Sequence, residues 1–515
     1  MSVYSAKILN FTRDNKHYLV VIFSLLVSMV TGYLRQTSIA FVFGVNQDTD
    51  IFLISYTIPE FVFVALPIIL TPAIIPFFIK ARKTYGDLIA WSFVKKIFYF
   101  VTVSLLFFIS LIFLFKETIL NLLAPGFTTE MIFVSNKILL IMLPGIFFMG
   151  LAVLMGSFLQ VYKKFARPIL MTAVYNVVFI AALFLFPDQN SLIRASWGVT
   201  LGSFFALLLQ IPLFLHYIPK KIDHSKSNIN HSEWLNTLKF TAWLSVGYLT
   251  HHLIYFIDRS MASTLGDGKV AILNFAYHLA LSVGQISGLA VSIVVFPNLT
   301  EKISDNLITL ANRELSKALK YVVSLSVPIT VGLLLFRNPL VRLLYEHGEF
   351  SSAETLNVSN VLIFYAIAVF FDAICQPFWR YVYAIQKGFV VFGVNLAQTT
   401  VRIAANFLFI QIIGYNGIAL SAVLGLIVQM FILGQFIKHN FKFFMEKEDQ
   451  TFILKILISS IFSASIVHFL VRPLTIGLST VPFLVVAGAL FVIFIGLFYL
   501  IMQLDRKKLL LKGDK

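Results

Sequence analysis

Residues 28–60 read SMVTGYLRQTSIAFVFGVNQDTDIFLISYTIPE, and the rest of the chain can be interpreted from this segment. Arg35 lies inside an apolar run long enough to cross a bilayer. An acidic turn ending at Asp50 leads into a second apolar run, in which Glu60 follows Pro59. A mid-bilayer arginine costs roughly 2.5–3.5 kcal/mol on insertion scales, so it usually faces protein or a watery cavity. The segment therefore predicts a polar cavity between helices or, alternatively, an arginine whose side chain reaches the membrane surface.

The composition places the whole chain in a membrane. Of its 515 residues, 59 % are hydrophobic and only 12 % are charged, whereas soluble domains carry about 25 % charged residues. Cys375 is the only cysteine, which excludes a disulfide framework and a cysteine-based zinc site. Metalloprotease, P-loop and serine-hydrolase motifs do not occur in the sequence. We therefore expect a transport protein with no metal and no cofactor, and not an enzyme.

Hydropathy predicts an all-α polytopic fold with fourteen transmembrane helices, each needing about 20 mostly apolar residues. The predicted spans cover residues 18–43, 50–79, 93–115, 131–160, 168–186, 193–217, 235–264, 270–297, 318–337, 355–384, 388–413, 416–438, 452–472 and 480–503. Within the sixth of these spans, Gly198 and Gly202 permit close approach of another helix.

The distribution of Lys and Arg predicts the orientation of the chain. With the N-terminus in the cytoplasm, inside segments hold 29 of the 40 basic residues and outside loops hold seven. The remaining four lie within apolar spans. This asymmetry predicts that both termini are cytoplasmic. It also accounts for the net charge of +16 without binding of nucleic acid.

Short sequence matches recur along the chain at nearly one spacing, which indicates an internal repeat. Residues 134–136 recur at 358–360, and Tyr56 and Pro76 recur as Tyr277 and Pro297. We predict a six-helix lobe over 1–220, a second six-helix lobe over 221–445, and two additional helices with a basic tail over 446–515. Repeats with an even number of spans are parallel, and substrate usually binds between such halves.

A few charged or titratable residues within the predicted spans are candidates for function. Asp258 and Arg259 lie in the seventh span, His278 in the eighth, and Asp372 and Arg402 in the tenth and eleventh. Opposite charges in neighbouring spans usually pair, which lowers the cost of burial. Asp258, Asp372 and Arg402 are therefore candidates either for ion pairing or for an ion site, and the histidine for a helix contact or a proton relay.

Intramembrane arginines favour an anionic cargo. A guanidinium group matches phosphate with two parallel hydrogen bonds, so a phosphate headgroup on a long lipid tail suits the pattern. The two additional helices could shape a groove for such a tail. A sodium-coupled or drug antiporter also has two six-helix halves, and that alternative stays open on the residues alone.

A series of motifs, in this order, resembles one known family. They are GYLRQTSIAFVFGVNQDTDIFLISYTIP (32–59), NLLAPGF (121–127), VYKKFARPILMTAVYNV (161–177), IDRSMASTLGDGKVAILNFAYHL (257–279), VVFPNLTEKIS (294–304), LLYEHGEF (343–350), VYAIQK (382–387) and GYNGIALS (414–421). The chain resembles the MurJ/MviN family of the multidrug/oligosaccharidyl-lipid/polysaccharide exporter superfamily. Members of that family flip lipid II, the undecaprenyl-linked precursor of peptidoglycan, to the outer leaflet of the bacterial inner membrane.

The resemblance implies roles for particular residues. Arg35 and Asp50 stand at the positions of an important arginine and aspartate, and with Arg259 and His278 they are the expected cavity residues. Gly32 and Glu60 are expected to take part in gating. His278 stands where the family has an arginine.

Two further cavity arginines of the family are absent, because Met29 and Phe63 occupy their positions. These departures concern the cargo more than the fold. Lipid II is the expected cargo, and another lipid-linked glycan of the O-antigen or exopolysaccharide type is the alternative. A cation-coupled drug exporter and a membrane scaffold are weaker alternatives. Membrane potential or a Na⁺ or H⁺ gradient is the expected energy source, membrane lipids are the surroundings, and a monomer is favoured.

Overall fold

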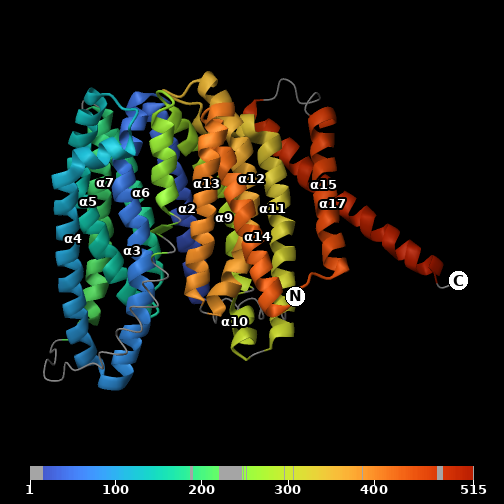
Figure 1. Ribbon diagram of the computed structural model, residues 1–515, viewed down its shortest axis with the longest axis horizontal. Coiled ribbons are helices and arrows are strands. Elements are labelled where there is room, and N and C mark those ends of the chain that lie inside the picture. Colours follow the sequence, from blue (N-terminus) through green and yellow to red (C-terminus); the bar gives the residue numbers. More distant parts are fainter. Residues whose placement is uncertain are drawn as a thin grey trace, which may run out of the picture. The chain divides into compact units, whose positions relative to one another are not determined.

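In the part of the chain that it describes, the computed structural model consists mainly of long helices (Figure 1). It describes residues 16–185, 190–219, 246, 249–250, 252–294, 296–305, 307–385, 387–471 and 479–513, and none of these residues forms a β-strand. Twelve of the described helices are long and apolar enough to cross a membrane. The predicted all-α, multi-pass membrane architecture is therefore confirmed.

The predicted number of fourteen spans stays a prediction. The predicted span at 235–264 falls largely outside the described residues. The one at 270–297 coincides with helix α9 (Lys269–Val294), of which Lys269–Gly284 counts as a shorter apolar helix. The other predicted spans each correspond to a described helix of sufficient length.

The chain forms two compact units, Met1–Val270 (unit 1) and Ala271–Lys515 (unit 2). Unit 1 thus includes residues 252–263, which form a helix that we call the 252–263 helix. The predicted lobe boundaries at 220 and 445 follow from the sequence repeat and stay a prediction.

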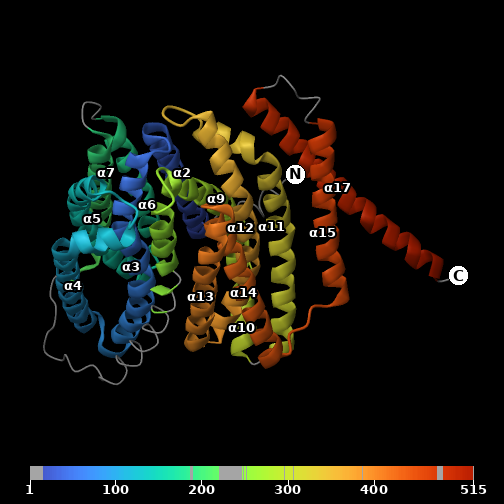
Figure 2. The same cartoon turned by 45° about the horizontal axis from the view of Figure 1, so that its top comes forward.

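Unit 1 contains six long helices besides the 252–263 helix among its described residues. They are α2 (Lys16–Phe43), α3 (Gln47–Tyr85), α4 (Asp87–Leu123), α5 (Thr129–Val161), α6 (Ala166–Leu185) and α7 (Ser191–Tyr217). Helix α5 packs against both α3 and α7, and α6 packs against α2 and α7 (Figure 2). The functional residues of unit 1 lie on α2, α3, α6 and the 252–263 helix.

Short polar residues fix where several of these helices begin. The side chain of Asn46 accepts a hydrogen bond from the backbone N–H of Thr49 and so caps α3, and Thr128 caps α5 in the same way. A helix leaves its first N–H groups without partners inside the helix, and such caps supply one. Asn46 follows Gly44, whose φ of +64° favours glycine. The tight turn between α2 and α3 is therefore encoded locally.

Two glycines on α7 bring that helix close to α6. A Cβ added at Gly202 would lie 2.8 Å from the carbonyl oxygen of Tyr175, and one added at Gly198 would lie 3.2 Å from that of Phe179. Small residues at such spacing let two helix backbones approach closely. The predicted close packing at Gly198 and Gly202 is confirmed, and its partner is α6 of the same chain.

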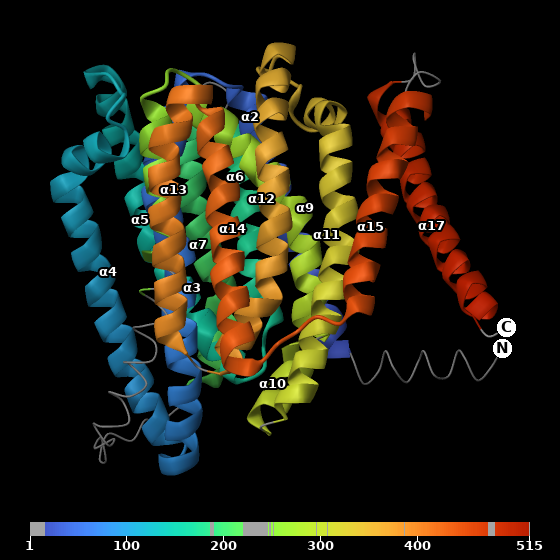
Figure 3. The ribbon, with the colours of Figure 1, turned by 45° about the vertical axis from the view of Figure 1, so that its right-hand side comes forward.

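Unit 2 continues from α9 through a second set of helices (Figure 3). They are α10 (Phe296–Ser304), α11 (Ile308–Tyr345), α12 (Ser352–Ala384), α13 (Gly388–Ile413), α14 (Asn416–Phe441), α15 (Lys447–Ile466), the π-helix η1 (Val467–Val471) and α17 (Thr480–Gly513). Helix α12 packs against α11 and α14, and α15 packs against α11 and α17.

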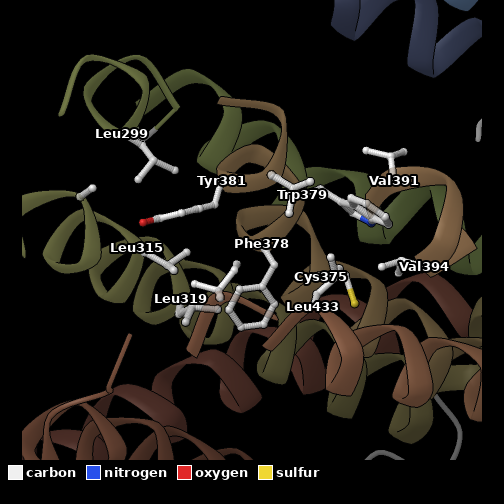
Figure 4. Packing of buried hydrophobic residues seen from close by; sticks show 13 residues of the cluster. Leu299, Leu315, Leu319, Cys375, Phe378, Trp379, Tyr381, Val391, Val394 and Leu433 are labelled. Atoms are coloured by element: carbon white, nitrogen blue, oxygen red, sulfur yellow. The ribbon is translucent and has the colours of Figure 1, made fainter. Parts of the chain in front are cut away.

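A buried cluster joins α10–α14 of unit 2 at one end of these helices (Figure 4). Tyr381 and Cys375 are both fully buried there, and Phe378 lies between them on α12. Because the single cysteine is an inert core residue in this cluster, it leaves the prediction of a disulfide-free fold intact.

The outward face of α4 shows what surrounds the helices. Phe100, Phe107 and Leu114 recur every seven residues along it and are 71 %, 65 % and 70 % exposed. Large apolar side chains that are exposed at this spacing form a continuous stripe, which water would not favour. The stripe is a lipid-facing surface.

Candidate functional site in unit 1

Arg35 lies in a box of aromatic rings formed by α3 and α6. Its Nη1 donates a hydrogen bond to the hydroxyl of Tyr56 at 3.1 Å, and the hydroxyl of Tyr175 lies 3.2 Å from that of Tyr56. The Arg35 Cζ atom is 5.6 Å from the centre of the Tyr56 ring, 5.5 Å from that of Tyr175 and 5.8 Å from that of Phe179. We call Tyr56, Tyr175 and Phe179 the aromatic box.

The aromatic box makes a charged residue tolerable within the membrane. A cation over a ring face gains about 0.5–1 kcal/mol at exposed sites and about 2 kcal/mol when desolvated. The summed attraction of three such rings is comparable to the roughly 2.5–3.5 kcal/mol that an arginine costs at mid-bilayer. The guanidinium is therefore held among helices of unit 1 by rings that attract its charge.

The sequence builds this box through helix packing. Tyr175 and Phe179 are one turn apart on α6, at the level where Gly202 and Gly198 of α7 meet its backbone. The ring of Phe52, one turn before Tyr56 on α3, lies 6.0 Å from that of Phe179 on α6, which aligns α3 with the box. Packing against α3 and α7 thus fixes the orientation of the rings, and the side chain of Arg35 reaches them from α2.

Arg259 on the 252–263 helix binds α3 with its guanidinium. Its Nη1 donates to Oε2 of Glu60 at 2.8 Å and to Oγ1 of Thr57 at 2.6 Å. The side chains of Arg259 and Glu60 are 13 % and 26 % exposed. A charge-assisted bond of this kind is stronger than one between neutral groups. Two predicted candidates from distant parts of the sequence are therefore partners.

Asp50, near the start of α3, bonds the turn that follows the 252–263 helix. It is 1 % exposed, and its Oδ2 accepts a hydrogen bond of 2.7 Å from the backbone N–H of Gly268. Gly268 has a φ of +74°, and an added Cβ would lie 2.8 Å from Cγ1 of Val45. Only glycine meets both conditions without strain. We call the contacts among Asp50, Gly268, Glu60, Arg259 and Thr57 the α3 latch.

The end of α4 and the turn after it also contact the 252–263 helix. The hydroxyl of Ser260 donates to the carbonyl of Leu122 at 3.1 Å, and the N–H of Gly126 donates to the hydroxyl of Ser263 at 3.3 Å. A Cβ at Gly126 would overlap the backbone of Ser263. The predicted motif NLLAPGF therefore contains a glycine required for close backbone contact.

Gly32, predicted to take part in gating, lies at the contact of α2 with α6. A Cβ added there would be 3.3 Å from Nδ2 of Asn176, which donates to the hydroxyl of Thr31 at 3.4 Å. The hydroxyl of Ser28 bonds the carbonyl of Ile169 at 2.9 Å. Gly32 is thus part of the packing that carries Arg35.

The remaining predicted residues are distributed over both units. Asp258 is buried on the 252–263 helix in unit 1, whereas His278 is half-buried on α9 in unit 2. In unit 2, Oδ2 of Asp372 accepts a hydrogen bond of 3.4 Å from Gln376, one turn along α12. Arg402 is buried on α13, with Gly425 of α14 packed against its Cβ. Their roles as ion sites or pairing partners stay predictions.

The sequence did not single out several members of the site. Tyr175, Phe179, Thr57 and Gly268 became visible only with the helix packing. Tyr56 was noted only as a repeated position, although a hydroxyl on the helix that follows an intramembrane arginine was a usable signal. The GDG sequence at 266–268 was a second one, since it predicts a turn with positive φ.

Comparison with known proteins gives a consistent result. A protein-family model described as Lipid II flippase MurJ matches residues 39–488. A protein from Buchnera aphidicola subsp. Schizaphis graminum, named probable lipid II flippase MurJ, is 25 % identical over 417 residues, covering 79 % of this chain and 80 % of its own.

Solved structures share the fold. One titled Lipid II flippase MurJ, inward closed conformation, has a TM-score of 0.79 at 22 % identity and covers 95 % of this chain and 99 % of its own. An inward-facing multidrug resistance MATE family transporter of the MOP superfamily has a TM-score of 0.63 at 12 % identity, covering 82 % and 98 %. At these identities the likeness concerns the architecture alone.

Proposed function

The chain belongs to the MurJ family of lipid II flippases, and from this premise we propose that it moves lipid II from the inner to the outer leaflet of a bacterial inner membrane. The cargo is a polyprenyl diphosphate that carries the sugars of a peptidoglycan precursor. The observation that carries the proposal within this chain is Arg35, held among membrane helices by the aromatic box. The protein is a multi-pass membrane transporter, and we propose no covalent chemistry for it.

Arg35 is suited to bind the diphosphate. A guanidinium has five N–H donors, and the aromatic box engages Nη1 through the hydroxyl of Tyr56. Among the described residues, Nε of Arg35 is buried and has no hydrogen-bond partner. Phosphate oxygens would satisfy the remaining donors in the paired geometry that arginine favours. The rings orient the group in advance, which lowers the entropic cost of binding.

The α3 latch would form the outer gate. In the alternating-access cycle, the outer ends of α3 and of the 252–263 helix separate to release cargo, which requires the bonds of Asp50 and Glu60 to break. Arg259 can exchange the Glu60 carboxylate for a cargo phosphate, because both are anionic oxygen ligands of similar reach. Cargo binding would thus weaken the latch, and this competition would couple binding to opening. His278 is proposed as a further cation for the diphosphate.

The transport cycle needs an energy source. A membrane potential does work of about 2.3 kcal/mol per charge per 100 mV, and a cationic site would be drawn back toward a negative interior after cargo release. We propose this as the resetting force, with a Na⁺ or H⁺ gradient as the alternative. The cycle uses no cofactor, and we propose that both termini are cytoplasmic and that a monomer is sufficient.

The test is a comparison of Arg35→Gln and Arg35→Lys. In cells that depend on this protein, lipid II reaching the outer leaflet is measured by its cleavage on addition of an external lipid II-degrading enzyme. We expect Arg35→Gln to abolish exposure of lipid II and Arg35→Lys to retain a fraction, because lysine keeps the charge but loses the paired hydrogen bonds. Arg313→Gln, an exposed residue on α11, is the control. Wild-type exposure of lipid II with Arg35→Gln present in the membrane would contradict the role of Arg35.

A further inference from the structure

Unit 2 contains an open cavity of about 1150 Å³ that is lined by the end of α11, the start of α12, α15, η1 and the start of α17. This volume exceeds the roughly 300–1,000 Å³ typical of pockets for small ligands. In the predicted orientation the cavity lies at the outer end of these helices. All its lining residues belong to unit 2, whereas the aromatic box and the α3 latch belong to unit 1.

The charged side chains that line the cavity are mainly basic. Arg337, Arg342 and His468 line it, and Glu346 is the one carboxylate among the described lining residues. That carboxylate is already engaged, because Oε2 accepts from the hydroxyl of Thr355 at 2.7 Å and Oε1 lies 3.3 Å from Nε of Arg342. The arginines therefore leave a net positive charge in the cavity lining even when the histidine is neutral.

Arg337 has an unused donor at this place. Its Nη1 donates to the carbonyl of Leu334 at 2.9 Å, which holds the side chain along α11. Its Nε is buried and finds no hydrogen-bond partner among the residues that the structure describes. A buried donor of a charged group is costly to leave unsatisfied, so an anionic oxygen at this position would stabilise the site.

Two helix N-termini also border the cavity, and in α12 the carboxylate of Glu354, which caps the first turn, offsets part of the positive potential. Ser352 and Ala353 in the first turn of α12 line the cavity, and so does Thr480, the first residue of α17. The first N–H groups of a helix carry a partial positive charge, and anions bind there readily. The helix ends and the two arginines therefore act on the same space.

Much of the remaining lining is apolar. Val331, Leu335, Ile461 and Phe483 contribute to it, from α11, α15 and α17. The helix changes to the wider π-form at Val467–Val471, whose first three residues line the cavity, and such π-turns occur frequently at functional sites. A ligand that matches this lining has an anionic group for the arginines and an apolar chain for the aliphatic and aromatic side chains.

We propose that this cavity binds the phosphate group of a lipid, with Arg337 and Arg342 contacting the phosphate and the hydrocarbon chain lying along α11 and α15. All the helices involved are membrane spans, so the surrounding bilayer supplies such a ligand directly. A phospholipid with an anionic headgroup and a polyprenyl phosphate share this chemistry. The site does not depend on the proposed cargo, because it follows from the membrane location of unit 2 alone.

The test uses the full-length protein, purified, delipidated and examined by native mass spectrometry with phosphatidylglycerol or with phosphatidylcholine of the same acyl chains. We expect one phosphatidylglycerol per chain, with an affinity at least tenfold above that for phosphatidylcholine. In Arg337→Gln/Arg342→Gln this preference should fall about tenfold, whereas in Arg313→Gln, on the same helix, it should not change. Equal preference in the double variant and the wild type would overturn the proposal.

Additional binding measurements identify the ligand and control for misfolding of the double variant. Ala464→Trp fills the cavity from α15 while both arginines stay, and it should reduce binding as strongly as the double variant. If phosphatidylglycerol binds more tightly than undecaprenyl phosphate, the source is the bilayer; the reverse order supports a polyprenyl lipid at the same site. Displacement of the bound lipid by millimolar inorganic phosphate would show a site for soluble anions and would overturn the assignment to a lipid.

Discussion

Replacement of Asp50 by alanine should shift the protein toward the state with an open outer gate. The carboxylate is 1 % exposed and accepts a hydrogen bond of 2.7 Å from the N–H of Gly268. Hydrogen bonds to charged groups contribute about 1.5–3 kcal/mol net. In the open state, water solvates both the carboxylate and the N–H group. The substitution therefore destabilises the closed state, relative to the open state, by the net free energy of this hydrogen bond.

This loss predicts a large change in the populations of the two states. Since about 1.4 kcal/mol corresponds to a factor of ten in an equilibrium constant, the ratio of open to closed protein should rise roughly ten- to one-hundred-fold. Asp50→Asn retains an oxygen acceptor and should show a smaller shift, because only the charge assistance is lost.

The populations can be measured as a distance distribution between two spin labels. Cysteines at Gln47 and Asp267, both exposed, report on the outer end of α3 and on the turn that contains Gly268; the buried Cys375 is replaced by alanine. Asp48→Ala is the matched control, since it removes a carboxylate from the same helical turn outside the latch. If Asp50→Ala gives the same distance distribution as Asp48→Ala, the latch is not held by this bond and the reasoning is refuted.

Two further changes test the packing around the latch. Glu60→Gln should lower the thermal stability of the purified protein because it weakens the bond to Arg259. The double variant Glu60→Arg/Arg259→Glu, which exchanges the two charges, should be more stable than either of its single variants. If the stability losses of the two single variants simply add in the double variant, the two residues do not interact directly. Gly126→Ala should strongly reduce the yield of folded protein because the new methyl group overlaps the backbone of Ser263, whereas Gly393→Ala, with no heavy atom within 4 Å, should be tolerated; equal yields would show that the turn after α4 can move aside.

The helical architecture was predictable because the bilayer imposes it. A chain in lipid must satisfy its backbone polar groups internally, so long apolar runs form helices. The span predicted at 388–413 has the same bounds as α13 (Gly388–Ile413). The span predicted at 416–438 starts at the first residue of α14 and ends three residues before the last residue of that helix. The largest differences occur where helices extend beyond the apolar region, as α4 does from Asp87 to Leu123, because hydropathy detects only the part within the membrane.

The partners of the candidate residues were not predictable in the same way. Arg35 was found because a charge in an apolar run is conspicuous, and Glu60 and Arg259 were found for the same reason. Their pairing depends on the register between α3 and the 252–263 helix, which tertiary packing sets and periodicity does not encode. The aromatic box escaped notice because tyrosine and phenylalanine are common among the 15 % aromatic residues of this chain. Only the close approach of α6 and α7 at Gly198 and Gly202 places two of these rings near Arg35.

The central claim is that this protein carries lipid II, although Met29, Phe63 and His278 stand at positions where the family resemblance implies arginine. The most direct measurement expresses it in a bacterium depleted of its own lipid II flippase and records growth and cell-wall synthesis, with Arg35→Gln and Arg313→Gln beside the wild type. We predict recovery with the wild type and with Arg313→Gln, and none with Arg35→Gln. Failure of the wild type to restore growth, with the protein present in the membrane, would contradict lipid II as the cargo.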